Sequence, residues 1–284
     1  MHKLILTSKL LLIIAVVTFG FTACQKNKLN DESEASSAQN FNVAEVEDDN
    51  LQIMADQADM NGEIDLRQSA TVQEVNLLGC AIVTKDSLSS PKKITIDFGT
   101  GCPGRDSSVT RKGKIIITYT GRYRNAGTVI HITSEDYFVN DNKVDIDRTV
   151  TNNGENPNGH LTYSIVSDRK VTFPDGRFST SSTDDKTREW IEGSNTPRDF
   201  SDDVYKVTGT GTHTSKKGIV YDVSIETALT RKVACRQFTA GVVKIIRYGQ
   251  RERYGVIDFG NGDCDDEATV TLDNGRTYTI SLRH

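Results

Sequence analysis

The sequence predicts an all-β protein, an antiparallel meander of hairpins that forms a twisted sheet or a partly closed barrel, with one short N-terminal helix. Three observations lead to this prediction. Apolar and polar residues alternate from residue 78 onward. Clusters of Asn, Asp, Gly and Pro interrupt these runs at short intervals. A segment with the letters Ile-Asp-Phe-Gly occurs twice, each time beside cysteines.

The alternation has a period of two, which is typical of strands with one buried and one solvent-facing side. In the run 115–123, Ile115, Ile117 and Tyr119 share one face and polar residues share the other. The runs 161–165 and 219–225 show the same pattern. Short strands separated by turn residues favour an antiparallel meander, and about 200 residues are compatible with a single all-β domain over 78–284.

The repeat predicts two related structural units, 78–121 and 233–284. One copy of the motif is Ile96–Cys102 and the other is Ile257–Cys264, with Cys80 and Cys235 upstream. Two apolar runs with a polar break lie between the cysteines of each copy, and this is a hairpin signal. Folding each hairpin brings its own cysteines together, so we expect the disulfides Cys80–Cys102 and Cys235–Cys264. Four cysteines allow three pairings, so bridges between the copies remain an alternative.

Both copies continue alike after the second cysteine. We expect turns at 111–114 and 273–276, each leading into another strand; the Asn274-Gly275 pair is a strong hairpin signal. Two copies are too few for a solenoid, so we expect them to close the two ends of one sheet. Asp97 and Asp258 recur with the motif and are expected to accept hydrogen bonds from loop amides.

The N-terminus predicts export. Residues 1–23 combine two lysines with a short apolar run, as in a secretory signal peptide, and the run is shorter than the roughly 20 apolar residues of a membrane-spanning helix. Phe21-Thr22-Ala23-Cys24 resembles a bacterial lipobox, although Leu is the family's usual first residue. The resemblance implies that Cys24 carries fatty acyl chains, palmitate among them, and Gln25 implies sorting to an outer membrane. Ordinary signal cleavage, with Cys24 left free, is the alternative.

The next segments are polar and acidic. We expect 24–42 to be a flexible tether, because it has too little apolar surface to fold. The acidic segment 43–77 should hold a short amphipathic helix at about 43–59, with further linker as the alternative. Residues 30–77 contain twelve acids and one base, whereas 78–284 are close to neutral. We expect these acids to be solvated, and their charge argues against nucleic acid as a partner.

Motifs of catalysis are absent from the sequence. The histidines are scattered, no cysteine pair has zinc-type spacing, and neither Gly-x-Gly turn opens a helix or carries the lysine of a phosphate loop. Acidic turns around Asp141 and Asp265 could hold Ca²⁺, but they lack EF-hand spacing, and solvated turns are the simpler interpretation. We therefore predict no catalytic residue, metal or cofactor.

One tract could bind a partner. Trp190 is the only tryptophan, and Arg188 and Glu189 precede it. If exposed, these three residues would make a platform for a glycan or an envelope protein. The alternative is that Trp190 is a core anchor on a strand.

As a whole, the chain resembles the uncharacterised, β-rich lipoproteins of the Gram-negative cell envelope, on its lipobox, acidic tether and paired Cys/Ile-Asp-Phe-Gly repeat. The resemblance implies an exported, lipid-anchored protein that faces the periplasm or the cell surface, and it implies no activity. We expect a binding or structural module for a polymer or protein partner. The alternatives are a lipocalin-like or half-barrel carrier of an apolar ligand and, as a third hypothesis, a hydrolase.

Overall fold

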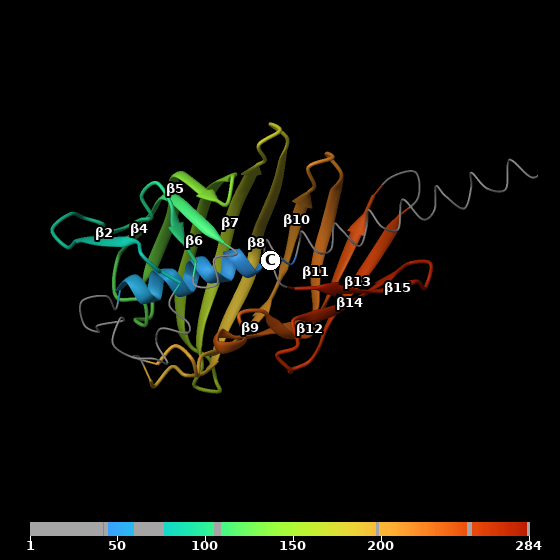
Figure 1. Ribbon diagram of the computed structural model, residues 1–284. Coiled ribbons are helices and arrows are strands. Elements are labelled where there is room, and N and C mark those ends of the chain that lie inside the picture. Colours follow the sequence, from blue (N-terminus) through green and yellow to red (C-terminus); the bar gives the residue numbers. More distant parts are fainter. Residues whose placement is uncertain are drawn as a thin grey trace, which may run out of the picture.

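The computed structural model describes residues 42, 45–59, 77–104, 109–196, 199–248 and 252–282. The predicted signal peptide, the lipidation site Cys24 and almost all of the predicted tether lie outside these residues. The described part is one antiparallel sheet of fifteen strands, one α-helix and a short 3-10 helix, Val233–Cys235 (Figure 1). The all-β meander with a short N-terminal helix is confirmed.

The strands follow each other through the sheet almost in chain order. They are β1 (Ile82–Asp86), β2 (Lys92–Asp97), β3 (Cys102–Pro103), β4 (Thr110–Tyr119), β5 (Val129–Val139), β6 (Asn142–Glu155), β7 (Leu161–Thr172), β8 (Phe178–Glu192), β9 (Val204–Thr208), β10 (Thr210–Thr214), β11 (Val220–Lys232), β12 (Phe238–Arg247), β13 (Arg253–Asn261), β14 (Glu267–Leu272) and β15 (Thr277–Ser281). β9 and β10 lie end to end and both pair with β8 and β11. β1 and β15 are the two ends of the strand order, so the sheet stays open.

The helix covers residues 45–59, and residue 42 is also helical. We call it the acidic helix. Figure 1 shows it lying across one face of the sheet, at a steep angle to β6, β7 and β8. No helix among the described residues is long and apolar enough to span a membrane. The helix was predicted as part of a segment preceding the β domain, and the structure places it in the core of that domain.

The core lies between the sheet and the acidic helix. One apolar cluster joins Leu51, Ile53 and Met54 of the helix to inward residues of β2 and β4 to β9, including Ile132 and Tyr163. A second cluster is built from β9 and β11 to β15, and the helix adds Val46 to it. The helix therefore contributes to both apolar clusters, while the alternating outer residues of the strands remain in solvent.

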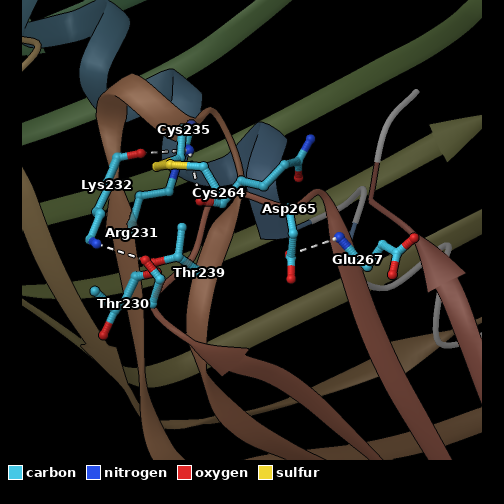
Figure 2. Close-up of a disulfide and its surroundings, with 10 residues drawn as sticks. Thr230, Arg231, Lys232, Cys235, Thr239, Cys264, Asp265 and Glu267 are labelled. Atoms are coloured by element: carbon cyan, nitrogen blue, oxygen red, sulfur yellow. Dashed lines mark hydrogen bonds between the residues drawn. A yellow bond between two sulfur atoms is a disulfide. The ribbon is translucent and has the colours of Figure 1, made fainter.

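The repeated units lie at the two ends of the strand order, as predicted. β1 and β2 form the first hairpin, and β12 and β13 form the second. The local disulfides are confirmed, with Cα atoms 5.7 Å apart in Cys80–Cys102 and 5.3 Å apart in Cys235–Cys264. Figure 2 shows the second bridge, beside which Lys232 Nζ donates a hydrogen bond to the Gly262 carbonyl. Two disulfides are consistent with an exported protein in an oxidising compartment.

The recurring aspartates cap the turns beside the bridges. Asp97 Oδ1 accepts a hydrogen bond from the Gly99 amide at 2.8 Å, and Asp258 Oδ1 accepts one from the Gly260 amide at 2.9 Å. The predicted role for these residues is confirmed. Because each carboxylate is engaged by a backbone amide two residues later, the motif is a structural feature of the turn.

One predicted turn is wrong. The turn at 273–276 lies between β14 and β15, but 111–114 belongs to the continuous strand β4. Gly113 has a φ of +77° there, and the pairing of β4 with β5 shifts between Lys112 and Lys114. The backbone thus makes a bulge within a strand where the sequence pattern predicted a reversal.

Candidate functional site

The acidic helix and the sheet meet through a layer of charged side chains, which we call the ionic layer. Its carboxylates are Glu45, Glu47, Asp48, Asp49 and Asp56, and its cations are Arg111, Arg124, Arg148, Arg169, Lys186, Arg188 and Arg231. The cations come from β4, β6, β7, β8, β11 and the β4–β5 loop. The expectation that these acids would be solvated is wrong, since each of the five pairs with a cation of the β domain and most are buried.

Asp48 and Asp49 each bridge two arginines at the centre of this layer. Asp48 contacts Arg169 at 3.2 Å and Arg148 at 3.9 Å. Asp49 contacts Arg231 at 3.1 Å and Arg188 at 3.4 Å. Burial alone would raise the pKa of Asp48, but the positive charges of Arg169 and Arg148 outweigh burial and hold that pKa below its usual value. The helix is therefore docked by ion pairs as well as by apolar contacts.

The predicted binding residues do not form an exposed platform. Trp190 is fully buried, so the prediction of a Trp190 contact surface is wrong and the core-anchor alternative is confirmed. Its Nε1 donates to Asp203 Oδ1 at 3.1 Å, and the guanidinium of Arg124 lies 4.2 Å from its ring centroid. Arg188 is also buried and lies over the ring of Tyr205. A period-two strand pattern assigns Trp190 to a face but does not say which face is covered.

Glu189 points to the other side of β8 from its two neighbours. Its Oε1 accepts a hydrogen bond from Asn156 at 2.8 Å and lies 2.7 Å from His160 Nδ1. These contacts lower the pKa of Glu189, and the hydrogen bond with His160 is the largest cause of the shift. The structure thus separates Glu189 from Trp190 and Arg188, and the three residues make no common site.

Two buried carboxyls near Trp190 have unusual acidities. Burial raises the pKa of Asp56 to about 6 despite the nearby positive charges of Arg124 and Arg188. Burial and the negative charge of Asp56 raise the pKa of Asp203 to about 8. Asp203 accepts hydrogen bonds from Trp190 and from the Tyr205 hydroxyl. These groups pack closely around the end of the acidic helix and form part of the core.

The strongest candidate site is a cavity of about 230 Å³ beside the acidic helix, which we call the edge cavity. Its walls are Glu47 and Leu51 of the helix, Tyr137 and Val139 of β5, Asn142, Val144 and Ile146 of β6, Arg169, Val171 and Phe173 from β7 and its turn, Ser179, Thr180 and Ser181 of β8, and His213, Ser215 and Lys216 from β10 and its turn. The β7–β8 and β10–β11 turns lie on the same side of the sheet in Figure 1, at the ends of these strands. Lys216 Nζ lies 5.1 Å from the Phe173 ring centroid.

The strand register divides the cavity into two walls. β5, β6 and β7 contribute mainly apolar residues, with Val144 paired to Val171. β8 and β10 contribute hydroxyls and an imidazole instead. Ser181 of β8 pairs with Arg169 of β7 on one side and with His213 of β10 on the other. The cavity therefore has an apolar wall and a polar wall joined by Arg169.

His213 is the least satisfied group on the polar wall. It is only 6% exposed, and its Nδ1 has no hydrogen-bond partner among the described residues. Burial and the charge of Arg169 lower the pKa of His213 to about 4, although a hydrogen bond to the Thr180 backbone opposes the shift. The imidazole is thus neutral near pH 7. A buried acceptor without a partner is costly, which makes this nitrogen a natural contact for a ligand.

The edge cavity is not apparent from the sequence pattern. His213, Arg169 and Leu51 lie far apart in the chain and are brought together by the meander and the docked helix. The one available signal was Arg169, a charged residue at the inward position of a strand whose period-two pattern runs through Tyr163, Ile165 and Ser167.

No group of three or more His, Cys, Asp or Glu side chains in the described part of the chain could hold a metal ion. The acidic turn considered for Ca²⁺ is organised internally, since Asp265 Oδ1 accepts the Glu267 amide at 3.2 Å (Figure 2). His131 Nε2 lies 2.7 Å from Asp147 Oδ1, and both side chains of this pair are exposed to solvent.

Comparisons with protein-family models, curated proteins and solved structures found no significant match to this chain.

Proposed function

We propose that the protein is a lipid-anchored binding protein of the bacterial envelope that takes up a small, partly apolar ligand in the edge cavity. The observation that carries the proposal is the cavity of about 230 Å³ between the acidic helix and the sheet. Small-molecule sites are typically concave, largely apolar, and supplied with a few polar groups. Of the functions considered from the sequence, the carrier of an apolar ligand agrees best with this geometry.

The size and lining of the cavity limit the ligand. Drug-sized sites usually occupy about 300–1,000 Å³, so this cavity suits a smaller molecule, such as one with a single short chain. Val144, Val171 and Ile146 offer an apolar surface for such a chain. Burial of this chain would supply about 25 cal/mol for each Å² of apolar area removed from water.

Binding can be tested with octan-1-ol as a neutral probe. We expect it to shift the methyl NMR signals of Val144, Ile146 and Val171 in the wild-type protein. Ser179→Phe, which places a ring in the cavity from β8, should abolish these shifts. Ser164→Phe on the exposed side of β7 is the matched control and should keep them. Unperturbed methyl signals in a folded wild-type protein would exclude this function.

Membrane attachment is a separate part of the proposal and rests on the resemblance of residues 21–24 to a lipobox. Acylation contributes about 0.8 kcal/mol for each buried methylene, so several chains make a stable anchor. We expect the mass of the mature chain to show an acylated Cys24, and Cys24→Ala to release the protein from membranes. An unmodified Cys24 would remove the anchor from the proposal. Contact with a glycan or an envelope protein and a hydrolase activity stay predictions.

A further inference from the structure

The charges around the edge cavity do not balance. Three cations and two carboxylates line it or pair with its lining residues, namely Arg111, Arg169 and Lys216 with Glu47 and Asp48. Glu47 is bound by Arg111, whose guanidinium also donates to the Tyr137 hydroxyl. The carboxylates are therefore already occupied by arginines, and the surplus of charge in this region is positive.

The surplus coincides with the polar wall. Arg169, Ser181 and His213 stand side by side across three neighbouring strands. Lys216 is exposed and marks the solvent side of the same wall. A negatively charged group placed here could receive hydrogen bonds from Arg169 and the serine hydroxyls. The unpartnered His213 Nδ1 would then face either an acidic hydrogen of that group or, once the imidazole is protonated, its negative charge.

We propose that the ligand of the edge cavity is a single-chain amphiphilic anion, with its acidic head against Arg169, Ser181 and His213 and its chain against Val144, Ile146 and Val171. This inference rests on the proposed function, because it specifies the ligand of the same cavity. The geometry assigns the two ends of the ligand to the two walls. A cationic head would meet Arg169 and Lys216 instead, and a wholly apolar ligand would leave His213 Nδ1 without a partner.

An anionic head also links binding to a proton. The groups that line the space around His213 are Arg169, Lys186 and Lys216 among the cations and Glu45, Glu47 and Asp48 among the acids, and Tyr221 packs against its ring. A carboxylate in contact with the imidazole favours its charged form. Binding of a carboxylate should therefore take up a proton at His213, and its affinity should rise as the pH falls from 8 to 6.

The test is titration calorimetry of the full chain with four probes that share an eight-carbon chain. We expect octanoate or octyl phosphate to bind at least tenfold more tightly than octan-1-ol, and octylammonium not to bind. The two anions distinguish a carboxylate head from a phosphate head. Equal affinities for octanoate and octan-1-ol, or binding of octylammonium, would overturn the acidic head and leave the cavity function standing. Failure of all four probes would refute both.

Two variants locate the head group. Lys216→Gln changes an exposed side chain, so the fold should persist, and we expect about threefold weaker binding of octanoate. His213→Gln keeps a hydrogen-bonding side chain that cannot become charged. It should remove the pH dependence of octanoate binding. Retention of full octanoate affinity by Lys216→Gln and of the pH dependence by His213→Gln would contradict the placement.

Discussion

Asp203 shows how strongly burial sets the chemistry of a single residue in this protein. Its carboxyl group lies among Trp190, Tyr205 and the end of the acidic helix, and its pKa is raised to about 8, mainly by burial. The folded state therefore retains a proton that the unfolded chain releases near the ordinary value of 3.8. Because the native state binds more protons over this interval, the free energy of unfolding must fall as the pH rises through it.

We expect this loss of stability to be clearest between pH 6.5 and 8. Asp56, with a pKa of about 6, has largely completed its titration below that window. The imidazole of His213, whose ordinary pKa is 6.5, opposes the fall by only about 0.4 kcal/mol. The free energy of unfolding from urea denaturation should fall by about 1–2 kcal/mol across the window. Asp203→Asn should flatten the dependence, whereas Asp56→Asn, which removes only the second cause of the raised pKa of Asp203, should weaken it and move it to lower pH. An equally steep fall in Asp203→Asn would assign the effect to another group.

At Gly113, the space around the residue determines whether a larger side chain can be accommodated. A Cβ added to Gly113 would lie 1.9 Å from the Asp136 carbonyl oxygen, whereas one added to Gly218 would have no heavy atom within 4 Å. Both glycines have a positive φ, +77° and +74°. They therefore share the same backbone strain on substitution, and only Gly113 adds a collision with the neighbouring strand.

This pair separates the strain of the backbone from the collision. We expect Gly218→Ala to cost about 1–2 kcal/mol, as for a side chain in a left-handed conformation, and Gly113→Ala to cost several kcal/mol more in chemical denaturation. Equal losses in the two variants would mean that β4 and β5 can separate at the bulge without penalty.

At the scale of an element, the acidic helix shows how buried ion pairs fix the position of a helix on a sheet. Its side chains are buried on the acidic as well as the apolar face, which is unusual for a helix at a sheet surface. Buried ion pairs gain little over well-packed apolar residues, but removing one partner leaves an uncompensated charge. The ionic layer therefore specifies where the helix docks and in which register, in addition to the apolar contacts of Leu51, Ile53 and Met54.

Asp49, like Asp48, is a sensitive position in this layer, because it serves two buried arginines. We expect Asp49→Ala to lower the free energy of unfolding by about 3–5 kcal/mol. Asp147→Ala removes the carboxylate of the exposed pair with His131 and should cost about 1 kcal/mol or less. Urea denaturation of both variants at one pH makes the comparison. Similar small losses would show that water reaches Arg188 and Arg231.

At the scale of the molecule, the sequence predicted what depends on local pattern. Alternation predicted the strands, turn residues such as Asn274 and Gly275 predicted a hairpin, and the repeat predicted both disulfides. Gly113 was mistaken for a turn because a glycine after charged residues fits a bulge equally well. The burial of Trp190 was one of two alternatives that the sequence left open. The burial of the helix acids could not be predicted, because it depends on partners far along the chain, such as Arg231 for Asp49.

The edge cavity could not be predicted for the same reason. Because the acidic helix forms part of its wall, the cavity also bears on where the folded domain begins. Its lining includes Glu47 and Leu51, so the cavity is complete only with the acidic helix in place. The same helix neutralises arginines from β4 to β11. The folding unit should therefore begin before residue 45, rather than near residue 78 where the strand pattern starts.

Two shortened chains test this boundary. A chain that begins at residue 42 should unfold cooperatively, because it keeps the acidic helix and the sheet together. A chain that begins at residue 77 leaves buried arginines such as Arg188 and Arg231 without their acids and exposes Ile132 and Tyr163. We expect it to lack a cooperative thermal transition and near-ultraviolet circular dichroism, and a synthetic peptide of residues 42–59 should restore both. If the shorter chain unfolded at the same temperature as the longer one, the helix would be an accessory to the sheet and the edge cavity would not depend on it for its shape.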